Sequence, residues 1–219
     1  FKGILVKTKK CSALHLSINL LFVDFGSVQI LFKELKALLS GELLDEKQGD
    51  FFDYLDLVGK YSDNRISEDK KYWNDRINNF PSYPKLPRSG RLSPKTSIGN
   101  EFKRYTFYLN SSCLESLKRK SIKYGLTLSS VILSAYSYVI SLWSENKKFL
   151  LNIPIQNRLP VLDSKNIVGE FTDVNILEVD FEQTKSFLQY SRSIFEQLMD
   201  DLDHRNYSGI DVISDLDRK

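Results

Sequence analysis

The stretch that decides the fold is 14-LHLSINLLFVDFGSVQILFKEL-35, in which one periodicity gives way to another. Residues 14–18 alternate between apolar and polar, which is the period of a strand with one face on a core. After the Gly–Ser pair the apolar residues recur at helical spacing, with Ser27 as the expected N-cap. The sequence predicts a strand, a tight loop and a helix, and it places Asn19 and Asp24 where an apolar pattern would not choose them.

The rest of the chain predicts an α/β (α+β) fold with one break in composition. Strands are expected at 1–6, 105–109, 149–155 and 174–179, and helices at 28–39, 51–57, 67–77, 112–125, 127–143 and 184–202. Residues 81–100 contain four prolines and two glycines, which exclude a helix or a central strand. We therefore expect 81–100 to be an extended, mobile surface linker between segments 1–80 and 101–219.

Composition excludes several classes of protein. The chain has 219 residues, 42% of them hydrophobic, and a formal net charge of +3, which is ordinary for a folded soluble protein. The densest basic run, Lys118 to Lys120, falls on an expected helix without stacking aromatics, so we expect no nucleic-acid partner. No apolar run is long enough to cross a bilayer and no secretory signal is present, so we expect no membrane partner. Two cysteines, Cys11 and Cys113, are too few for a disulfide framework or a zinc site; we expect both to be buried, in a reducing cytoplasm.

Signatures of phosphoryl transfer, hydride transfer and metal chemistry are missing from the sequence. It has no Gly-rich phosphate loop, no nucleophile elbow and no metal-ligand cluster, and we interpret His15 and His204 as structural. What remains is a set of polar residues beside apolar segments, namely Asn19, Asp24, Asn157, Arg158, Glu170 and Thr172.

Asp24 follows four apolar residues and precedes a helix, so we expect its carboxylate to be at least half buried. A buried carboxylate needs a partner. Arg158 closes an apolar strand, and its guanidinium can bind a carboxylate through two hydrogen bonds. The pattern alone leaves two readings open, an ion pair between these residues or Asp24 as a simple loop cap.

The spacing of Asn19 and Asp24 also resembles a motif of a known family. Their spacing resembles the core motif of heterocyclization domains of nonribosomal peptide synthetases, where two aspartates are separated by four residues. Ordinary condensation domains of the same superfamily carry two histidines at this motif instead. Four further segments resemble the heterocyclization branch in the same order: Tyr72-Trp73 with Pro84-Lys-Leu-Pro87, Asn157-Arg158-Leu-Pro160, Val168-Gly-Glu-Phe-Thr172 and Asp203 to Gly209.

The resemblance implies two chloramphenicol-acetyltransferase-like lobes that meet in a V, with a tunnel between them. Residues 1–80 would be the C-terminal part of the N-lobe, 81–100 the inter-lobe linker and 101–219 the N-terminal part of the C-lobe. The chain begins as a strand without an initiator Met, and it lacks the later family motifs linked to cyclodehydration. We therefore expect a fragment of a longer domain.

The resemblance also implies an enzyme. It would condense a carrier-bound acyl group with carrier-bound Cys, Ser or Thr and then cyclodehydrate the product to a thiazoline or oxazoline, as in siderophore biosynthesis. No cofactor would bind directly, because the substrates arrive on phosphopantetheine arms. The implied partners are donor and acceptor peptidyl or aryl carrier proteins and the neighbouring synthetase domains.

Two positions depart from the family pattern. Asn19 stands for the first aspartate and cannot ionise, and Glu170 stands for the usual aspartate of the Val-Gly-Asp-Phe-Thr segment. The expected site comprises Asn19 and Asp24 as the catalytic motif positions, with Arg158, Asn157, Glu170 and Thr172 as structural or tunnel residues. We favour a mainly structural Asp24, paired with Arg158, and expect Asn19 to hydrogen-bond within its loop beside the tunnel. Alternatives are a domain that only condenses and a non-catalytic domain that docks carrier proteins; an ordinary acyltransferase of this fold would need a His motif that this sequence lacks.

Overall fold

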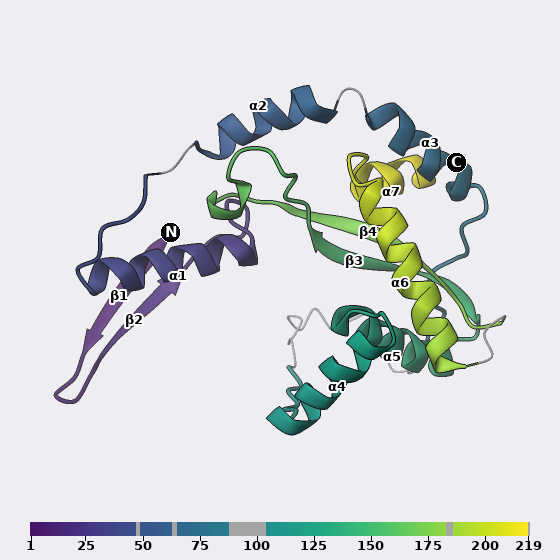
Figure 1. Cartoon of the computed structure of the whole chain (residues 1–219), viewed down its shortest axis with the longest axis horizontal. Helices are drawn as coiled ribbons and strands as arrows, with labels where there is room; N and C mark the ends of the chain where they lie inside the picture. Colours follow the sequence, from purple (N-terminus) through teal and green to yellow (C-terminus); the bar gives the residue numbers. More distant parts are fainter. Residues whose placement is uncertain (47–48, 63–64, 88–103, 183–185, 219) are drawn as a thin grey trace, which may run out of the picture. The chain divides into compact units, whose positions relative to one another are not determined.

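The computed structural model describes residues 1–46, 49–62, 65–87, 104–182 and 186–218. Helices and strands follow one another in the order shown in Figure 1. Their bounds are β1 (Lys2–Lys7), β2 (Ser12–Ser17), α1 (Phe25–Leu39), α2 (Phe51–Ser62), α3 (Ile66–Ile77), α4 (Ser111–Lys123), α5 (Leu128–Trp143), β3 (Lys148–Gln156), the 3-10 turn η1 (Ser164–Asn166), β4 (Thr172–Asp180), α6 (Phe187–Asp203) and α7 (Gly209–Asp217). The mixed α/β composition that the periodicity predicts is confirmed.

The chain divides into two compact units, which are described separately. The first contains residues 1–74, 154–175 and 205–219, and the second contains 75–153 and 176–204. Strands β3 and β4 pair with each other, and each supplies residues to both units. Residues 81–87 form neither helix nor strand, as their prolines predict, whereas 88–100 lie outside the described residues. The lobe boundary at 81–100 therefore stays a prediction.

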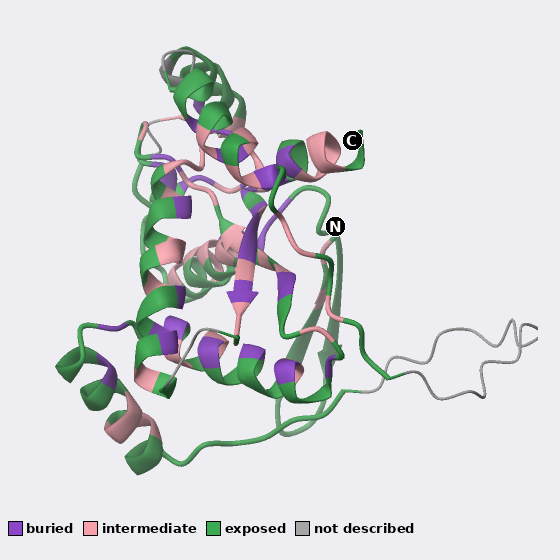
Figure 2. Cartoon of the chain, turned by 90° about the vertical axis from the view of Figure 1, so that its right-hand side faces the viewer, coloured by how far each residue is buried: buried purple, intermediate pink, exposed green. Residues whose placement is uncertain are grey.

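The hairpin of β1 and β2 is exposed on both faces. Its strands are antiparallel, with Lys2 opposite Ser17. Ile4 and Leu14 are 51% and 46% exposed, and the hairpin is green near the N label in Figure 2. The expectation that one face of 14–18 lies on a core is wrong for the described chain, because the two strands pack chiefly on each other. Alternation reports that a strand has an apolar face, not which element covers it.

Helix α1 begins directly after Asp24. The Asp24 backbone is extended (φ −84°, ψ 176°), and its carboxylate accepts a hydrogen bond from the Ser27 amide at 2.6 Å. An extended residue whose side chain binds the amide three positions on is the N-cap. The expectation that Ser27 caps this helix is therefore wrong, and its hydroxyl is free to bond elsewhere.

The core of the first unit is an aromatic cluster between α2 and the segment after β3. Phe171 meets the rings of Phe51 and Tyr54 edge-on, at centroid distances of 5.1 and 4.9 Å. Leu159 and Ile167 complete the buried cluster. A Cβ on Gly169 would overlap the Phe51 ring, so only glycine allows this segment to lie against α2.

The second unit packs α5 and α6 on the ends of β3 and β4. Its buried cluster comprises Phe149, Leu177, Val179, Tyr190 and Ile194. Four serines of α5 are also buried, namely Ser130, Ser134, Ser137 and Ser141. Their hydroxyls donate to carbonyls of their own helix or of its N-cap, three or four residues earlier, which satisfies their buried donors.

Three local expectations are wrong: a strand, a helix cap and the burial of the two cysteines. Residues 105–109 form no strand, and Tyr105 and Phe107 are 81% and 91% exposed, because no described strand pairs with them. The α4 helix is capped by Asn110, whose Oδ1 accepts from the Cys113 amide at 2.8 Å, and not by a capping box that starts at Ser112. Both cysteines, Cys11 and Cys113, are exposed where burial was expected.

The helix expected at 184–202 begins at Phe187, and residues 184–185 lie outside the described ranges.

In the described ranges, no single helix has both the length and the apolar character of a membrane span. Helices α4 and α5 meet these criteria only when taken together, across a bend of 101°.

Candidate functional site

The loop between β2 and α1 carries Asn19 at its start and Asp24 at its end. The Asn19 side-chain oxygen accepts from the Leu21 amide at 2.9 Å, and its carbonyl accepts from the Phe22 amide at 3.2 Å. Asn19 is exposed and folds the loop back on itself as an Asx turn. The expected hydrogen bonding of Asn19 within its loop is confirmed, whereas its place beside a tunnel stays a prediction.

Asp24 and Arg158 form an ion pair across 134 residues of sequence. Arg158 Nη2 donates to Asp24 Oδ1 at 3.0 Å. The side chains of Asp24 and Arg158 are only 1% and 12% exposed. The pair predicted from the sequence is present, and because Asp24 Oδ1 also accepts the Ser27 amide, the two readings that the sequence left open are both realised by one oxygen atom.

Both terminal nitrogens of the Arg158 guanidinium donate two hydrogen bonds each. Nη1 donates to the carbonyls of Ser164 and Ile167 at 2.6 and 2.7 Å, and Nη2 also donates to the Ser27 hydroxyl at 2.9 Å. The guanidinium lies over the Phe171 ring, with its carbon 3.7 Å from the ring centroid. A buried cation needs such a set of acceptors to offset its desolvation. Arg158 therefore contacts three parts of the first unit: the turn at η1, the first turn of α1 and the aromatic core.

Ser27 makes the second tie between the loop and the 168–172 segment. Its hydroxyl donates to the Gly169 carbonyl at 2.7 Å and accepts from the Gly169 amide at 3.0 Å. The Asp24 amide donates to the same carbonyl at 3.0 Å. Ser27 is fully buried. The sequence interpretation missed this role, because the Gly169 partner lies 142 residues away and the position of Ser27 at the start of a helix indicates only a cap.

Asn157 ties the end of β3 to β4 and to the 203–209 segment. Its side-chain nitrogen donates to Asp173 Oδ2 at 3.1 Å and to the Arg205 carbonyl at 3.0 Å. Asp173 also accepts from the Ser208 hydroxyl at 2.9 Å. The sequence interpretation placed Asn157 in the site but missed Asp173, which is buried and organises this junction.

Glu170 and Thr172 stand apart from the ion pair. Glu170 Oε1 accepts from the Thr172 amide at 2.7 Å, and the Thr172 side chain is exposed. The Glu170 carboxylate is therefore engaged with its own chain two residues on. Of the six residues expected in the site, the structure brings Asp24 and Arg158 into contact, and it links Asn157 to the same segment through the Phe171 carbonyl, which accepts from the Asn157 amide at 2.8 Å.

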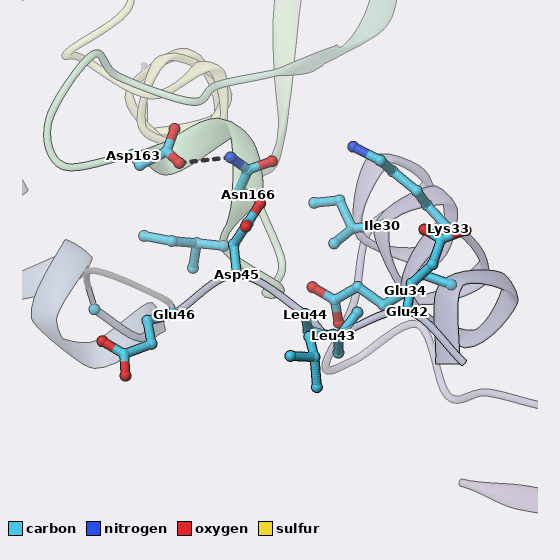
Figure 3. Close-up of a pocket in the computed structure, with 13 residues that line it drawn as sticks. Ile30, Lys33, Glu34, Glu42, Leu43, Leu44, Asp45, Glu46, Asp163 and Asn166 are labelled. Carbon is cyan, nitrogen blue, oxygen red and sulfur yellow. Dashed lines mark hydrogen bonds between the residues drawn. The ribbon is translucent and has the colours of Figure 1, made fainter. Parts of the chain in front are cut away.

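A separate cavity of about 290 Å³ lies beside α1 in the first unit. Acidic side chains from three segments line it, including Glu34, Asp45 and Asp163, with Lys33 at one side, as Figure 3 shows. Asp163 Oδ2 accepts from the Asn166 side chain at its edge. None of the residues expected in the site lines this cavity. Within the described chain, no group of three or more His, Cys, Asp or Glu side chains could hold a metal ion.

The arrangement favours support over proton transfer at Asp24. Its charge is neutralised by Arg158 and its Oδ1 already accepts two hydrogen bonds. Asn19 has no ionisable group, so it can donate and accept hydrogen bonds but cannot act as a base. The loop between them, residues 20–23, is therefore fixed at both ends by hydrogen bonds and can present its backbone and side chains in a constant geometry.

A family model and the related proteins found by comparison point to the same family. The family model described as Condensation domain matches residues 5–219. Pyochelin synthetase PchF of Pseudomonas aeruginosa is 32% identical over 213 residues, which are 94% of this chain and 11% of that protein. Bacitracin synthase 1 of Bacillus licheniformis is 32% identical over 209 residues, which are 93% of this chain and 4% of that protein.

Among solved structures, the chain resembles the EpoB cyclization-docking bidomain from Sorangium cellulosum. In its rhombohedral crystal form the TM-score is 0.82 at 32% identity, and the match covers 92% of this chain and 41% of that one. The condensation-domain fold is therefore confirmed for the part present, whereas the V of two lobes and the tunnel stay a prediction. The chain spans less than half of that structure and a small part of the curated relatives it matches.

Proposed function

The chain belongs to the condensation-domain family. We propose that it is part of a heterocyclization domain of a nonribosomal peptide synthetase. This part carries the core-motif loop, residues 19–24, and the arginine that binds its end. The observation that carries the proposal is the Asp24–Arg158 ion pair at the end of a loop with the heterocyclization spacing. The absence of two histidines before Asp24 separates this loop from the ordinary condensation motif. Similarity to a structure named for cyclization supports the same branch.

The proposed reaction has two stages. In the first, the amine of a carrier-bound Cys, Ser or Thr attacks the thioester carbon of a carrier-bound acyl group, which forms an amide and releases the donor thiol. In the second, the side-chain thiol or hydroxyl attacks the amide carbon, and loss of water gives the thiazoline or oxazoline. Alignment of two tethered substrates and exclusion of bulk water are the physical demands of this sequence.

The partners in this proposal are the donor and acceptor peptidyl or aryl carrier proteins, whose phosphopantetheine arms hold the substrates. Neighbouring synthetase domains would load those carriers in the cytoplasm. Asp24 and Arg158 support the loop, and Asn157 supports the segment beside it. Glu170 and Thr172 are tunnel residues in the proposal.

Asn19 supports a second candidate function, a domain that condenses without cyclising. The family pattern has a carboxylate at this position, and an amide cannot carry a proton away during water loss. A third candidate, a domain that only docks carrier proteins, would use neither stage.

One experiment separates the three. The intact parent protein is incubated with an acyl-loaded donor carrier and with acceptor carriers loaded with Cys, Ser or Thr, and the acceptor products are followed by mass spectrometry. Acyl transfer followed by loss of one water supports heterocyclization. Acyl transfer without loss of water supports condensation alone, and no transfer with retained carrier binding supports docking.

A further inference from the structure

Tyr54 of α2 lies next to the main chain around Arg158. Its side chain is only 4% exposed in the core of the first unit, where its ring packs edge-on against Phe171 at 4.9 Å and stacks on Phe51 at 6.3 Å. The hydroxyl emerges from this apolar cluster at the point where β3 has ended. A buried phenol hydroxyl needs polar partners there.

Both partners of the hydroxyl flank Arg158 directly. The Tyr54 hydroxyl accepts from the Leu159 amide at 2.9 Å and donates to the Asn157 carbonyl at 3.3 Å. One oxygen atom thus binds the peptide group before Arg158 and the one after it. Because β3 ends at Gln156, the hydroxyl supplies bonds that a neighbouring strand would otherwise make.

The same tyrosine also packs against the ring that the guanidinium contacts. Phe171 contacts the Tyr54 ring edge-on and lies under the Arg158 guanidinium, 3.7 Å from its carbon. Arg158 is therefore held through its backbone by the Tyr54 hydroxyl and through its side chain by a ring that Tyr54 packs against. No other residue in the described chain is shown to bond the main chain on both sides of Arg158.

We propose that Tyr54 is a positioning residue that acts through Arg158 to fix the Asp24 end of the core-motif loop. The inference rests on the proposed function and names a residue of α2, far from the motif in sequence, as part of its support. Burial raises the pKa of the Tyr54 hydroxyl above its ordinary value, chiefly by desolvation, so the hydroxyl stays neutral at ordinary pH and keeps both hydrogen bonds.

Tyr54→Phe in the intact parent protein tests the inference, because it keeps the ring and removes only the hydroxyl. Its loss leaves the buried Leu159 amide without a partner. We expect kcat for ring formation to fall about tenfold, with KM for the loaded carriers unchanged, since the change loosens the loop and not the carrier surface. Hydrogen exchange at the Leu159 amide should become faster.

Two further variants separate positioning from general stability. In an Arg158→Lys background, Tyr54→Phe should add no further loss of ring formation, because its effect passes through Arg158. Tyr207→Phe removes a hydroxyl of the same unit that donates to Asp215 at 2.5 Å, and it should leave kcat for ring formation unchanged. A wild-type kcat for ring formation in Tyr54→Phe, or full additivity with Arg158→Lys, would overturn the inference.

The outcome also remains separable from that of the proposed function. If the wild-type parent makes only linear amide, heterocyclization is wrong, and Tyr54 is then judged on the rate of amide formation with the same variants. A Tyr54→Phe protein with slower amide formation and faster Leu159 exchange supports the positioning role. Unchanged amide formation contradicts it.

Discussion

Ser27 and Gly169 bond each other in both directions, with the Ser27 hydroxyl donating to the Gly169 carbonyl at 2.7 Å and accepting from the Gly169 amide at 3.0 Å. One side-chain hydroxyl thus binds both backbone polar groups of Gly169, which have the same bonding need as in a β-sheet. It fixes the first turn of α1 on the 168–172 segment. The residue that the sequence marks only as a helix cap is therefore a link between two segments of the proposed site.

Ser27→Ala should destabilise this junction by about 1–3 kcal/mol, because the Gly169 amide would lose its partner in a buried place. Hydrogen exchange at the Gly169 amide in the intact parent protein measures the local opening free energy. Ser17→Ala is a matched control, since Ser17 is exposed on β2, and it should change local stability by less than about 0.5 kcal/mol. Equal effects of the two variants would contradict the role given to Ser27.

Removal of one partner of the Asp24–Arg158 pair should cost about 3–5 kcal/mol, because a buried charge would be left without compensation. Asp24→Asn tests the charge, since the amide keeps an oxygen for the Ser27 amide and for Arg158. Arg218→Ala is the control: Arg218 lies 3.5 Å from Asp215 with its side chain 76% exposed, and its loss should cost about 0–1 kcal/mol. Calorimetry of the parent protein and its variants checks the order of these effects.

Two glycines should respond to alanine in opposite ways. A Cβ on Gly209 would overlap the Val174 carbonyl oxygen, which belongs to the backbone and cannot rotate away. We expect Gly209→Ala to cost about 2–3 kcal/mol, the upper part of the range for overpacking. Gly59 lies within α2, and a Cβ added there would meet no atom within 4 Å, so Gly59→Ala should stabilise by about 0.5–1 kcal/mol. Urea unfolding of the two variants would show the opposite signs, and a neutral Gly209→Ala would contradict the close approach.

Tyr207 should make stability depend on alkaline pH. Tyr207 is a buried residue whose hydroxyl donates to Asp215, and desolvation followed by the neighbouring carboxylate raises its pKa from 10.0 to about 12. The folded state therefore holds this proton more tightly than the unfolded state, so the stabilisation is fully present below pH 10 and is lost as the pH rises through about 12. Tyr207→Phe should flatten the decline in unfolding free energy over this window. An unchanged decline would assign it to other groups.

The contrast between Arg158 and Ser27 shows what the sequence can predict. Arg158 and Asp24 are charges at the edges of apolar segments, which made them candidate partners, and the family resemblance then favoured their pair over a simple loop cap across 134 positions. Ser27 and Asp173 could not be assigned in this way, because a serine or aspartate near a helix or strand end satisfies many local patterns. Only the fold decides which of those hydrogen bonds is long-range.

Secondary structure followed the same rule. The α5 helix and the β3 and β4 strands were predicted because their apolar patterns match elements that pack in the second unit. Residues 105–109 alternate as clearly, yet they form no strand, because a strand needs a partner and local alternation does not supply one. The prediction that one face of β2 is buried was wrong for a similar reason, since alternation shows that a strand has an apolar face but not which element covers it.

Asn19→Asp is the decisive test of the motif position that departs from the family. The Asn19 side-chain oxygen accepts from the Leu21 amide at 2.9 Å, and an aspartate oxygen can accept the same bond, so the turn should survive and only ionisation is added. We expect little change in heterocycle formation by the intact parent protein, because the role inferred for Asn19 is to hold the loop. Asn19→Ala should instead lower local stability by about 0.5–1.5 kcal/mol through loss of that hydrogen bond.

A large gain in ring formation with Asn19→Asp would contradict the structural role and identify the native amide as a catalytic loss. Condensation that proceeds in the native protein while dehydration appears only in Asn19→Asp would assign the native domain to amide formation alone.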